Sequence, residues 1–341
     1  NALNYGRNSN PQDPIYLYNR EVDYLSGASI AISKSLFDQL DGFDQLYSPG
    51  YYEDTDLAMK VRAAGYKVVY VYSSKVIHLE GMSSDGDEST GMKRFQAINK
   101  VKFFTKWQST LSTGFSKPHQ NKYFYNRRVN QSILFIDSYL PTPDKDSGSN
   151  DILNTMTALI GTGFEVHFVC SVEVVNGSSC YIDDLRSRGI ITHVQQYKHH
   201  VASIIEKIVH DIDVCFIARY DNWNKFYNFI LNISDHISFI FDTVDLHHIR
   251  YQREADLALL GSKNSLEVNA IEKAEMRAIA QADNVLLRST SEIDYLVNRS
   301  IDRKKLHLFP ICRDIIPSSV GFDDRNGFLF LGGFLHTPNI D

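Results

Sequence analysis

The sequence predicts an α/β protein in two parts, of which the second is a doubly wound parallel sheet. Three observations support this prediction. The chain has 341 residues, more than one ordinary compact core holds. Between residues 113 and 130 no hydrophobic period is sustained, which is typical of a linker. Beyond that stretch, short apolar strands alternate with helix-like segments, the pattern of a parallel sheet covered by helices on both faces.

The first part contains short elements of mixed kind. In chain order, the patterns predict a strand at 22–33, a helix at 35–40, a loop at 44–52, a helix at 55–64, strands at 67–71 and 75–79, a loop at 81–91 and a helix at 92–107. The last helix has an apolar side, which we expect to pack onto the rest of this part. That side is made by Phe95, Ile98, Val101, Phe104 and Trp107.

The second part repeats strand, loop and helix. The patterns predict strands at 133–137, 165–170, 214–217, 238–242 and 284–287, with helices between them that include 152–161 and a long segment at 254–281. Ligands of doubly wound sheets bind beyond the carboxyl ends of the strands. We therefore expect a binding cleft at that edge of the sheet.

Composition excludes several classes of function. A formal net charge of -6 argues against a nucleic-acid binder, which normally carries a clustered basic excess. The longest apolar runs, such as 133–136 and 237–241, are far shorter than the roughly 20 residues of a membrane helix. The four cysteines lack metal-ligand spacing, so buried thiols in a reducing cytoplasm are expected.

An acidic cluster is the most informative feature of the first part. Glu53, Asp54 and Asp56 lie within four residues at the start of a predicted helix. The simpler interpretation is that first-turn acids stabilise the helix through its dipole. An aromatic, Gly-rich loop leads into the cluster, however, and His78 ends a strand shortly after it. Those two features favour a chemical site.

Four motifs follow one another along this part, and the third contains the acidic cluster. They are S-G-A at 26–28, G-F-D at 42–44, Y-Y-E-D-T-D-L at 51–57 and V-I-H-L-E-G at 76–81, with G-M-K-R-F-Q-x-x-N-x-x-K-F following at 91–103. This part resembles the carboxyl half of a family 2 glycosyltransferase of the GT-A fold, over residues 23–111. The resemblance implies that Asp54 is the catalytic base of an inverting transfer. It implies an acceptor site at Glu53, Asp56, Gly27 and Ala28, and a metal ligand at His78.

The chemistry of such a transfer suits these residue types. A carboxylate within hydrogen-bond reach of an acceptor hydroxyl makes the oxygen more nucleophilic as it attacks the sugar. The leaving diphosphate of a nucleotide-sugar donor is normally neutralised by Mg²⁺ or Mn²⁺. Lys93 and Arg94 follow the predicted loop, where a basic pair suits a clamp on the donor diphosphate; a solvated helix face is the alternative. Because the acceptors of such enzymes are often lipid-linked, peripheral contact of that helix with a membrane is a further alternative.

The second part carries weaker signals. A small-residue turn with Gly148 precedes a helix, but the G-x-G-x-x-G pattern of a dinucleotide site is missing. The remaining segments are F-D-T-V-D-L-H at 241–247, A-D-N-V-L-L-R-S-T-S-E at 282–292, L-F-P at 308–310 and G-F-L-F-L-G-G-F at 327–334. Together they resemble the amino-terminal domain of family 4 glycosyltransferases of the GT-B fold, over residues 132–341. The resemblance places Gly148, Asp245 and His247 along an acceptor cleft, with Arg288, Gly332 and Gly333 toward the donor.

These interpretations define the expected organisation. The carboxyl half of a GT-A domain is expected at 1–112, a linker at 113–130, a Rossmann-like GT-B amino-terminal domain at 131–317 and the start of its partner domain at 318–341. Both ends lack expected parts, so we expect a fragment that is incomplete for activity. The expected function is sugar transfer to a glycan, lipid-linked or free, in cell-surface polysaccharide synthesis in the cytoplasm, with no nucleic-acid partner. The alternatives are a non-catalytic glycan-binding second part and a sugar-nucleotide epimerase.

Overall fold

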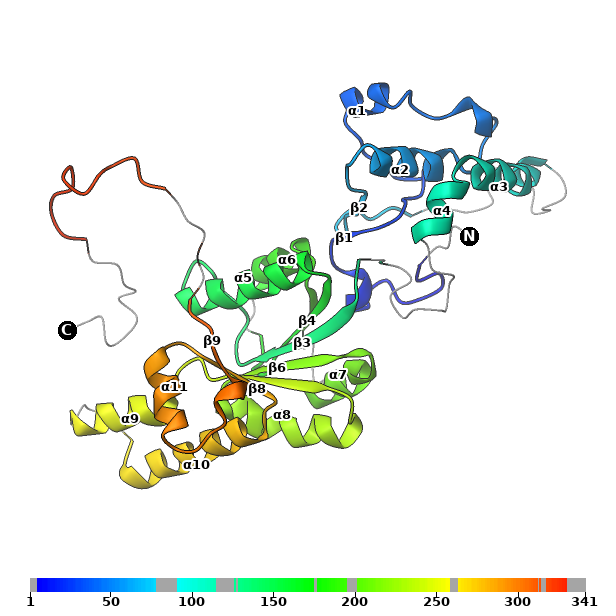
Figure 1. Cartoon of the computed structure of the whole chain (residues 1–341). Coiled ribbons are helices and arrows are strands. Elements are labelled where there is room, and N and C mark those ends of the chain that lie inside the picture. Colours follow the sequence, from blue (N-terminus) through cyan, green and yellow to red (C-terminus); the bar gives the residue numbers. More distant parts are fainter. Residues whose placement is uncertain are drawn as a thin grey trace. The chain divides into compact units, whose positions relative to one another are not determined.

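The computed structural model describes residues 5–77, 91–114, 126, 128–174, 177–194, 201–257, 263–311, 313 and 317–329. The chain divides into two compact units (Figure 1). Unit 1 comprises Asn1–Asn130 with the short piece Arg186–Gly189, and unit 2 comprises Gln131–Leu185 with Ile190–Asp341. Most of the predicted linker lies outside the described residues. No helix in the described ranges is long and apolar enough to cross a bilayer.

Unit 1 consists of short helices around one pair of strands. Its elements are the 3₁₀ turns Pro14–Tyr16, Gln45–Tyr47 and Gly91–Lys93, the strands β1 (Arg20–Glu21) and β2 (Val69–Tyr70), and the helices α1 (Lys34–Gln39), α2 (Glu53–Ala63), α3 (Arg94–Lys106) and α4 (Gln108–Gly114). The two strands pair antiparallel. The helices predicted at 35–40 and 55–64 are confirmed as α1 and α2.

The strand predicted at 22–33 is wrong. Residues 22–33 contain no strand, and the pairing stops at Glu21. A turn closes at 26–29, where the Ser29 N–H donates to the Ser26 carbonyl at 3.2 Å, and Ser and Gly residues of this kind favour turns over extended backbone. Of the strand predicted at 75–79, residues 75–77 are not in a strand, and 78–79 lie outside the described residues.

The helix predicted at 92–107 is confirmed, but its predicted apolar side is wrong. Ile98, Val101 and Phe104 are 46%, 66% and 40% exposed, whereas Asn99 and Phe103 are buried. The reason is that a buried polar side chain, Asn99, determines which side of the helix faces inward. The fully buried Asn99 needs hydrogen-bond partners that only the interior of unit 1 supplies, and this need sets the rotation of the helix.

Unit 2 is a sheet of seven parallel strands. The strands are β3 (Gln131–Asp137), β4 (Phe164–Cys170), β5 (Ile191–His193), β6 (Val214–Ala218), β7 (Ser238–Asp242), β8 (Asn284–Leu287) and β9 (Leu306–Leu308). The helices are α5 (Ser147–Gly161), α6 (Ser179–Ser187), α7 (Val201–Ile208), α8 (Tyr220–Ile233), α9 (His247–Asp256), α10 (Ser265–Gln281) and α11 (Thr290–Val297), with 3₁₀ turns at Val209–Asp211 and Arg303–Lys305.

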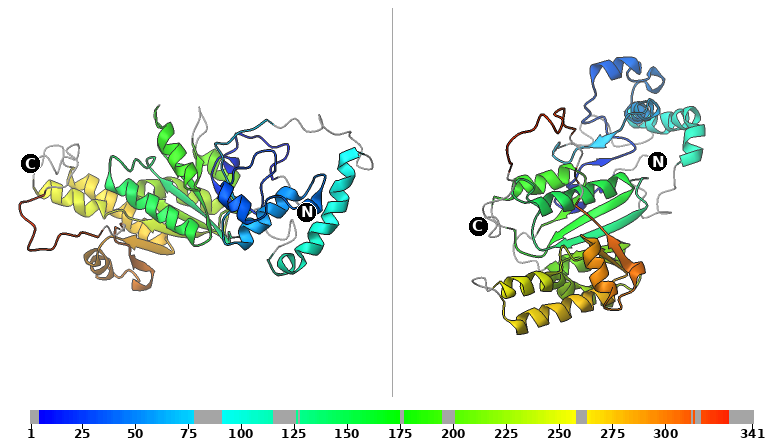
Figure 2. Two further views of the ribbon diagram at one scale, coloured as in Figure 1. Left: turned by 90° about the horizontal axis from the view of Figure 1, so that it is seen from above. Right: turned by 60° about the vertical axis from the view of Figure 1, so that its left-hand side comes forward.

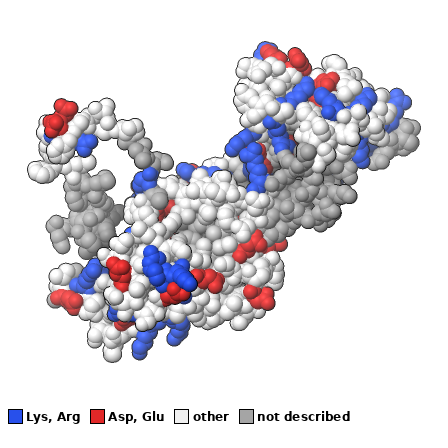
Figure 3. Space-filling model, in the orientation of Figure 1, with Lys and Arg blue, Asp and Glu red and all other residues white. Residues whose placement is uncertain are grey.

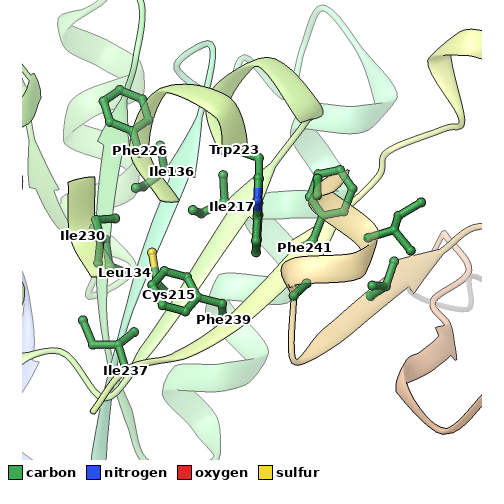
Figure 4. Packing of buried hydrophobic residues seen from close by; sticks show 14 of the residues in the cluster. Leu134, Ile136, Cys215, Ile217, Trp223, Phe226, Ile230, Ile237, Phe239 and Phe241 are labelled. Carbon is green, nitrogen blue, oxygen red and sulfur yellow. The ribbon is translucent and has the colours of Figure 1, made fainter. Parts of the chain in front are cut away.

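The strand order β5-β4-β3-β6-β7-β8-β9 confirms the predicted doubly wound α/β fold. The chain moves outward from β3 to β5, returns to β6 beside β3, and then moves outward the other way. Side chains of β3 alternate between two hydrophobic cores, with Ile133 and Phe135 on one face and Leu134 and Ile136 on the other. Helices α5 and α6 cover the first face, while α7, α8, α10 and α11 cover the second (Figures 2 and 4).

The single long helix predicted at 254–281 is wrong. Helix α9 ends at Asp256 and α10 begins at Ser265. Asn264 and Glu267 form a capping box, in which each side chain accepts from the other residue's backbone N–H, and this arrangement starts a new helix. The strands β5 and β9, of three residues each, were not predicted because so short a run carries no periodic signal.

Candidate functional site

The carboxylate of Asp54 is held at the start of α2 by three donors. The Gly27 N–H donates to Asp54 Oδ2 at 2.8 Å, while the Thr55 N–H and Oγ1 donate to Asp54 Oδ1 at 2.6 and 3.1 Å. A Cβ added at Gly27 would lie 3.4 Å from Oδ2, so a small residue suits this approach. Asp54 is half-buried and therefore reachable from solvent. The structure thus brings together two residues, Gly27 and Asp54, that the sequence assigned to one site.

The loop before Asp54 has a strained backbone that α3 holds in place. Tyr51 and Tyr52 both adopt positive φ angles, 73° and 76°, which non-glycine residues rarely do. The Asn99 side-chain amide donates to the carbonyls of Tyr47 and Gly50, each at 2.8 Å, and of Tyr51 at 3.3 Å. The sequence pattern gave Asn99 no role. Asn99 is the asparagine of the motif at 91–103, but hydrophobic periodicity disregards a single polar residue within a helix, so no contact was predicted for it.

Asp56 is fully buried in unit 1, two residues after the half-buried Asp54. Its Oδ1 accepts from the Tyr47 hydroxyl at 3.0 Å and from Trp107 Nε1 at 2.7 Å, and its Oδ2 accepts from Lys106 Nζ at 2.9 Å. Lys106 also reaches Asp44 at 2.7 Å. These contacts join α2 to α3 and account for both oxygens, so we attribute Asp56 to packing rather than to acceptor binding.

Glu53 and Tyr24 give the site its electrostatic character. Burial raises the pKa of Glu53, backbone hydrogen bonds oppose that effect, and the neighbouring Asp54 carboxylate adds to it. Glu53 Oε2 is buried and has no hydrogen-bond partner within the described part of the chain. Burial, followed by the Asp54 charge, raises the pKa of Tyr24 to about 12, which keeps its hydroxyl protonated. The half-buried Asp54 carboxylate therefore has two neighbours of different kinds, the protonated hydroxyl of Tyr24 and a carboxyl group, Glu53, with one unpartnered oxygen within the described residues.

The other residues predicted for this part lie in different settings. Ala28 is exposed in the turn beside Gly27, and Lys93 and Arg94 stand where α3 begins. A Cβ at Gly50 would lie 3.4 Å from Met92 Cε, so the start of α3 adjoins the loop before Asp54. His78 lies outside the described residues. Across the described ranges, no three His, Cys, Asp or Glu side chains could hold a metal ion together.

Unit 2 contains a cavity of about 800 Å³ at the carboxyl edge of its sheet. The residues that line it directly at or after strand ends are Asp137, Cys170, Arg219, Asp242, Arg288 and Phe309. This is the edge that the doubly wound prediction selected. The predicted Gly148 and Arg288 are among the lining residues, whereas Asp245 and His247 are not. Gly332 and Gly333 lie outside the described residues.

Arginine and aspartate side chains pair across the floor of this cavity. Arg288 binds Asp242 Oδ2 at 2.7 Å through Nη2, and Asp151 Oδ2 at 3.0 Å through Nη1. Arg219 Nε lies 3.0 Å from Asp137 Oδ1, and Arg219 has a φ of 71°. Burial raises the pKa of Asp242 to about 6, although Arg288 opposes this effect. Because these arginines are paired, the floor of the cavity is polar but close to neutral.

The predicted residue His247 is held in an ion-pair network at the start of α9. Its Nδ1 lies 2.9 Å from Asp245 Oδ1 and 3.2 Å from Glu275 Oε1. Burial by itself lowers the pKa of His247, but the hydrogen bonds to Asp245 and Glu275 outweigh burial and raise that pKa to about 9. Glu275 also accepts the backbone N–H groups of His247 and His248, at 2.8 and 3.0 Å. The two carboxylates therefore favour the charged form of the buried His247 side chain.

Comparison with known proteins shows partial sequence similarity to a rhamnosyltransferase. No protein-family profile matches the chain. Over 71 residues the chain is 38% identical to the N-acetylglucosaminyl-diphospho-decaprenol L-rhamnosyltransferase of Mycobacterium tuberculosis, in the strains CDC 1551 / Oshkosh and ATCC 25618 / H37Rv. The match covers 21% of this chain and 23% of those relatives, so the chain spans under a quarter of their length. Part of this chain is thus similar to a glycosyltransferase.

Among solved structures, the chain is similar to the sucrose-phosphate synthase of Thermosynechococcus elongatus. The match has a TM-score of 0.34 and 14% sequence identity, and it covers 53% of this chain and 48% of that protein.

Proposed function

We propose that this chain is part of a glycosyltransferase that moves a sugar from a nucleotide-sugar donor to a glycan acceptor, with Asp54 as the general base. The observation that carries this proposal is the half-buried Asp54 carboxylate, fixed by Gly27 and Thr55 at a helix start. A base must be held in a fixed position and stay accessible to its substrate, and the Asp54 carboxylate is held by three donors and only half-buried, which supports this role. The partial similarity to a rhamnosyltransferase supports sugar transfer in general.

The proposed reaction is a single displacement with inversion. The acceptor hydroxyl gives its proton to the Asp54 carboxylate while its oxygen forms a bond to the anomeric carbon of the donor sugar. The bond from that carbon to the diphosphate breaks, and the nucleoside diphosphate leaves with the electron pair. Glu53, with one buried oxygen unpartnered within the described residues, is proposed to bind an acceptor hydroxyl beside Asp54. Gly27 and Ala28 are proposed to border the same acceptor.

Donor binding is proposed at the start of α3. Lys93 and Arg94 provide positive charge next to the loop that precedes Asp54, as a diphosphate clamp requires. A divalent cation with His78 as one ligand remains part of the proposal, and when bound it would neutralise the leaving diphosphate. His78 lies outside the described residues, and no step of the displacement depends on the cation.

For unit 2 we propose a sugar-binding role in the cavity at the sheet edge. The paired arginines leave little free positive charge for a diphosphate, while carboxylates and the aromatic rings of Tyr139, Tyr181 and Phe309 suit a neutral sugar. Two forms of this role remain open. Unit 2 is either part of a second transferase centre, with Asp245 and His247 toward the acceptor and Gly332 and Gly333 toward the donor, or a glycan-binding unit without chemistry of its own.

Asp54→Asn tests the proposal in the full-length protein that carries this chain. The assay measures nucleoside diphosphate release and glycan product with a panel of donors and acceptors. The panel includes activated L-rhamnose and polyprenyl-diphosphate-linked N-acetylglucosamine, since the similar proteins are named as L-rhamnosyltransferases for an acceptor of that kind. We expect kcat to fall by about 10²–10⁴, the usual contribution of a general base, with the donor KM little changed. Asp38→Asn, in the exposed Lys34–Asp38 pair, is the matched control and should keep its activity.

Full transfer by Asp54→Asn would refute the role of this base. If Asp54→Asn still forms a second type of linkage, that chemistry belongs to unit 2. If Asp54→Asn loses all transfer, a purely binding role of unit 2 is favoured. Conversion of the free nucleotide-sugar without any acceptor would replace the transferase proposal with an epimerase.

A further inference from the structure

Helix α3 exposes an apolar face on the side away from the core of unit 1. Ile98, Val101 and Phe104 follow one another at three-residue steps and are 46%, 66% and 40% exposed. Ala97 is also exposed and lies one turn before Val101. These four residues, called the outer face of α3, form a continuous apolar surface on a helix of 13 residues.

The outer face is not needed for packing within unit 1. The opposite side of α3 supplies Phe103, which packs with Tyr47 and Met59. It also supplies Asn99, whose amide holds the loop before Asp54. Single exposed apolar residues are ordinary, but a continuous apolar face on one helix marks a contact surface.

The charge around the outer face has one sign. From Gly91 to Gly114 the chain has no acidic residue and five basic ones, which are Lys93, Arg94, Lys100, Lys102 and Lys106. Lys102 and Lys106 bind the Leu46 carbonyl and Asp44, within unit 1. Lys100 is exposed and lies one turn before Phe104, so it borders the outer face. In Figure 3, basic side chains lie over the α3 end of unit 1.

We propose that the outer face of α3 lies on an anionic lipid surface. An apolar face bordered by basic side chains is the pattern of a helix that rests in a membrane interface, with the apolar groups inserted and the ammonium groups at headgroup level. A protein partner fits less well, because the outer face has no acidic residue and no polar group to set a register. This inference does not depend on the proposed sugar transfer.

Vesicle co-sedimentation of the chain tests the inference. We expect binding to vesicles of phosphatidylcholine with phosphatidylglycerol, weakening as salt rises, and little binding to phosphatidylcholine alone. Val101→Glu should lower the affinity for the mixed vesicles by about tenfold or more, because it places a charge where an apolar group is inserted. Lys100→Glu should also lower it. Leu266→Glu, at an apolar residue of α10 that is 79% exposed, is the matched control and should bind as the unaltered chain does.

Equal vesicle binding by Val101→Glu and the unaltered chain would overturn the inference. The inference would also be overturned if the chain bound no vesicles but associated with itself or with an acidic protein, and Val101→Glu abolished that association. Ile98→Glu provides a second variant if Val101→Glu fails to fold, which circular dichroism would reveal. A failure of Asp54→Asn to affect transfer would leave the vesicle result unchanged, so the two proposals are tested separately.

Discussion

At the scale of single residues, the acidic cluster combines two different roles. Asp54 is half-buried and its donors are a loop N–H and its neighbour Thr55, whereas Asp56 is fully buried and ties α2 to α3. A first-turn dipole affects both carboxylates in the same way and does not separate them. Their difference follows from the side of α2 on which each lies, because only the inner side meets Tyr47, Lys106 and Trp107.

Asp56→Ala should destabilise unit 1 by about 3–5 kcal/mol, the usual cost of breaking a buried ion pair. The reason is that Lys106, Tyr47 and Trp107 lose the acceptor that satisfies them. Hydrogen exchange of the α2 amides measures this change. Asp38→Ala, which removes one partner of an exposed ion pair, should change the stability of unit 1 by about 1 kcal/mol or less. Equal effects of the two substitutions would refute the structural role of Asp56.

At the scale of elements, Glu275 anchors the start of α9 to α10. One carboxylate accepts the backbone N–H groups of His247 and His248 and pairs with both imidazoles. Burial raises the pKa of Glu275, but the hydrogen bonds from the histidines outweigh it and lower that pKa to about 2. Because α9 has no side-chain cap of its own, this carboxylate replaces one.

The stability of unit 2 should therefore depend on pH in a defined direction. His247 has a folded pKa of about 9, above its ordinary 6.5, so its contribution is complete below 6.5 and is lost as pH rises toward 9. Glu275 contributes fully above 4.5, and this is lost as pH falls toward 2. We expect the thermal unfolding temperature of unit 2 to decrease as the pH rises from 6.5 to 9. In His247→Gln this decrease should be smaller. His307→Gln is the control. A decline of the same size in His247→Gln would contradict the assignment.

At the scale of the whole molecule, each unit has hydrophobic clusters of its own. Met59 and Phe103 belong to a cluster within unit 1, and Met156 belongs to one beneath α5 in unit 2. Two separate cores normally unfold in separate steps, since each buries its apolar surface cooperatively.

We expect two transitions in denaturant, resolved by hydrogen exchange of α2 and of β3. Met156→Ala removes a fully buried side chain and should lower the stability of unit 2 by about 2–5 kcal/mol without moving the unit 1 transition. Asp56→Ala should move only the other transition. A single transition that both substitutions shift together would show that the units unfold as one.

The sequence alone determined the doubly wound sheet of unit 2, and with it the edge where a ligand cavity lies. The reason is local. Strands buried on both faces must be apolar throughout, as 133–136 are, and strands that alternate with helices run parallel, so the pattern predicted a cleft at the carboxyl edge of the sheet. Of the residues that the family resemblance assigned to binding, Gly148 and Arg288 line the cavity at this edge, whereas Asp245 and His247 do not. The tertiary structure alone decided which acid of the cluster is buried, which side of α3 faces the core, and which carboxylates raise the pKa of His247. Each depends on a partner far along the chain, such as Lys106, Tyr47 or Glu275, and no local pattern of hydrophobicity records such a contact.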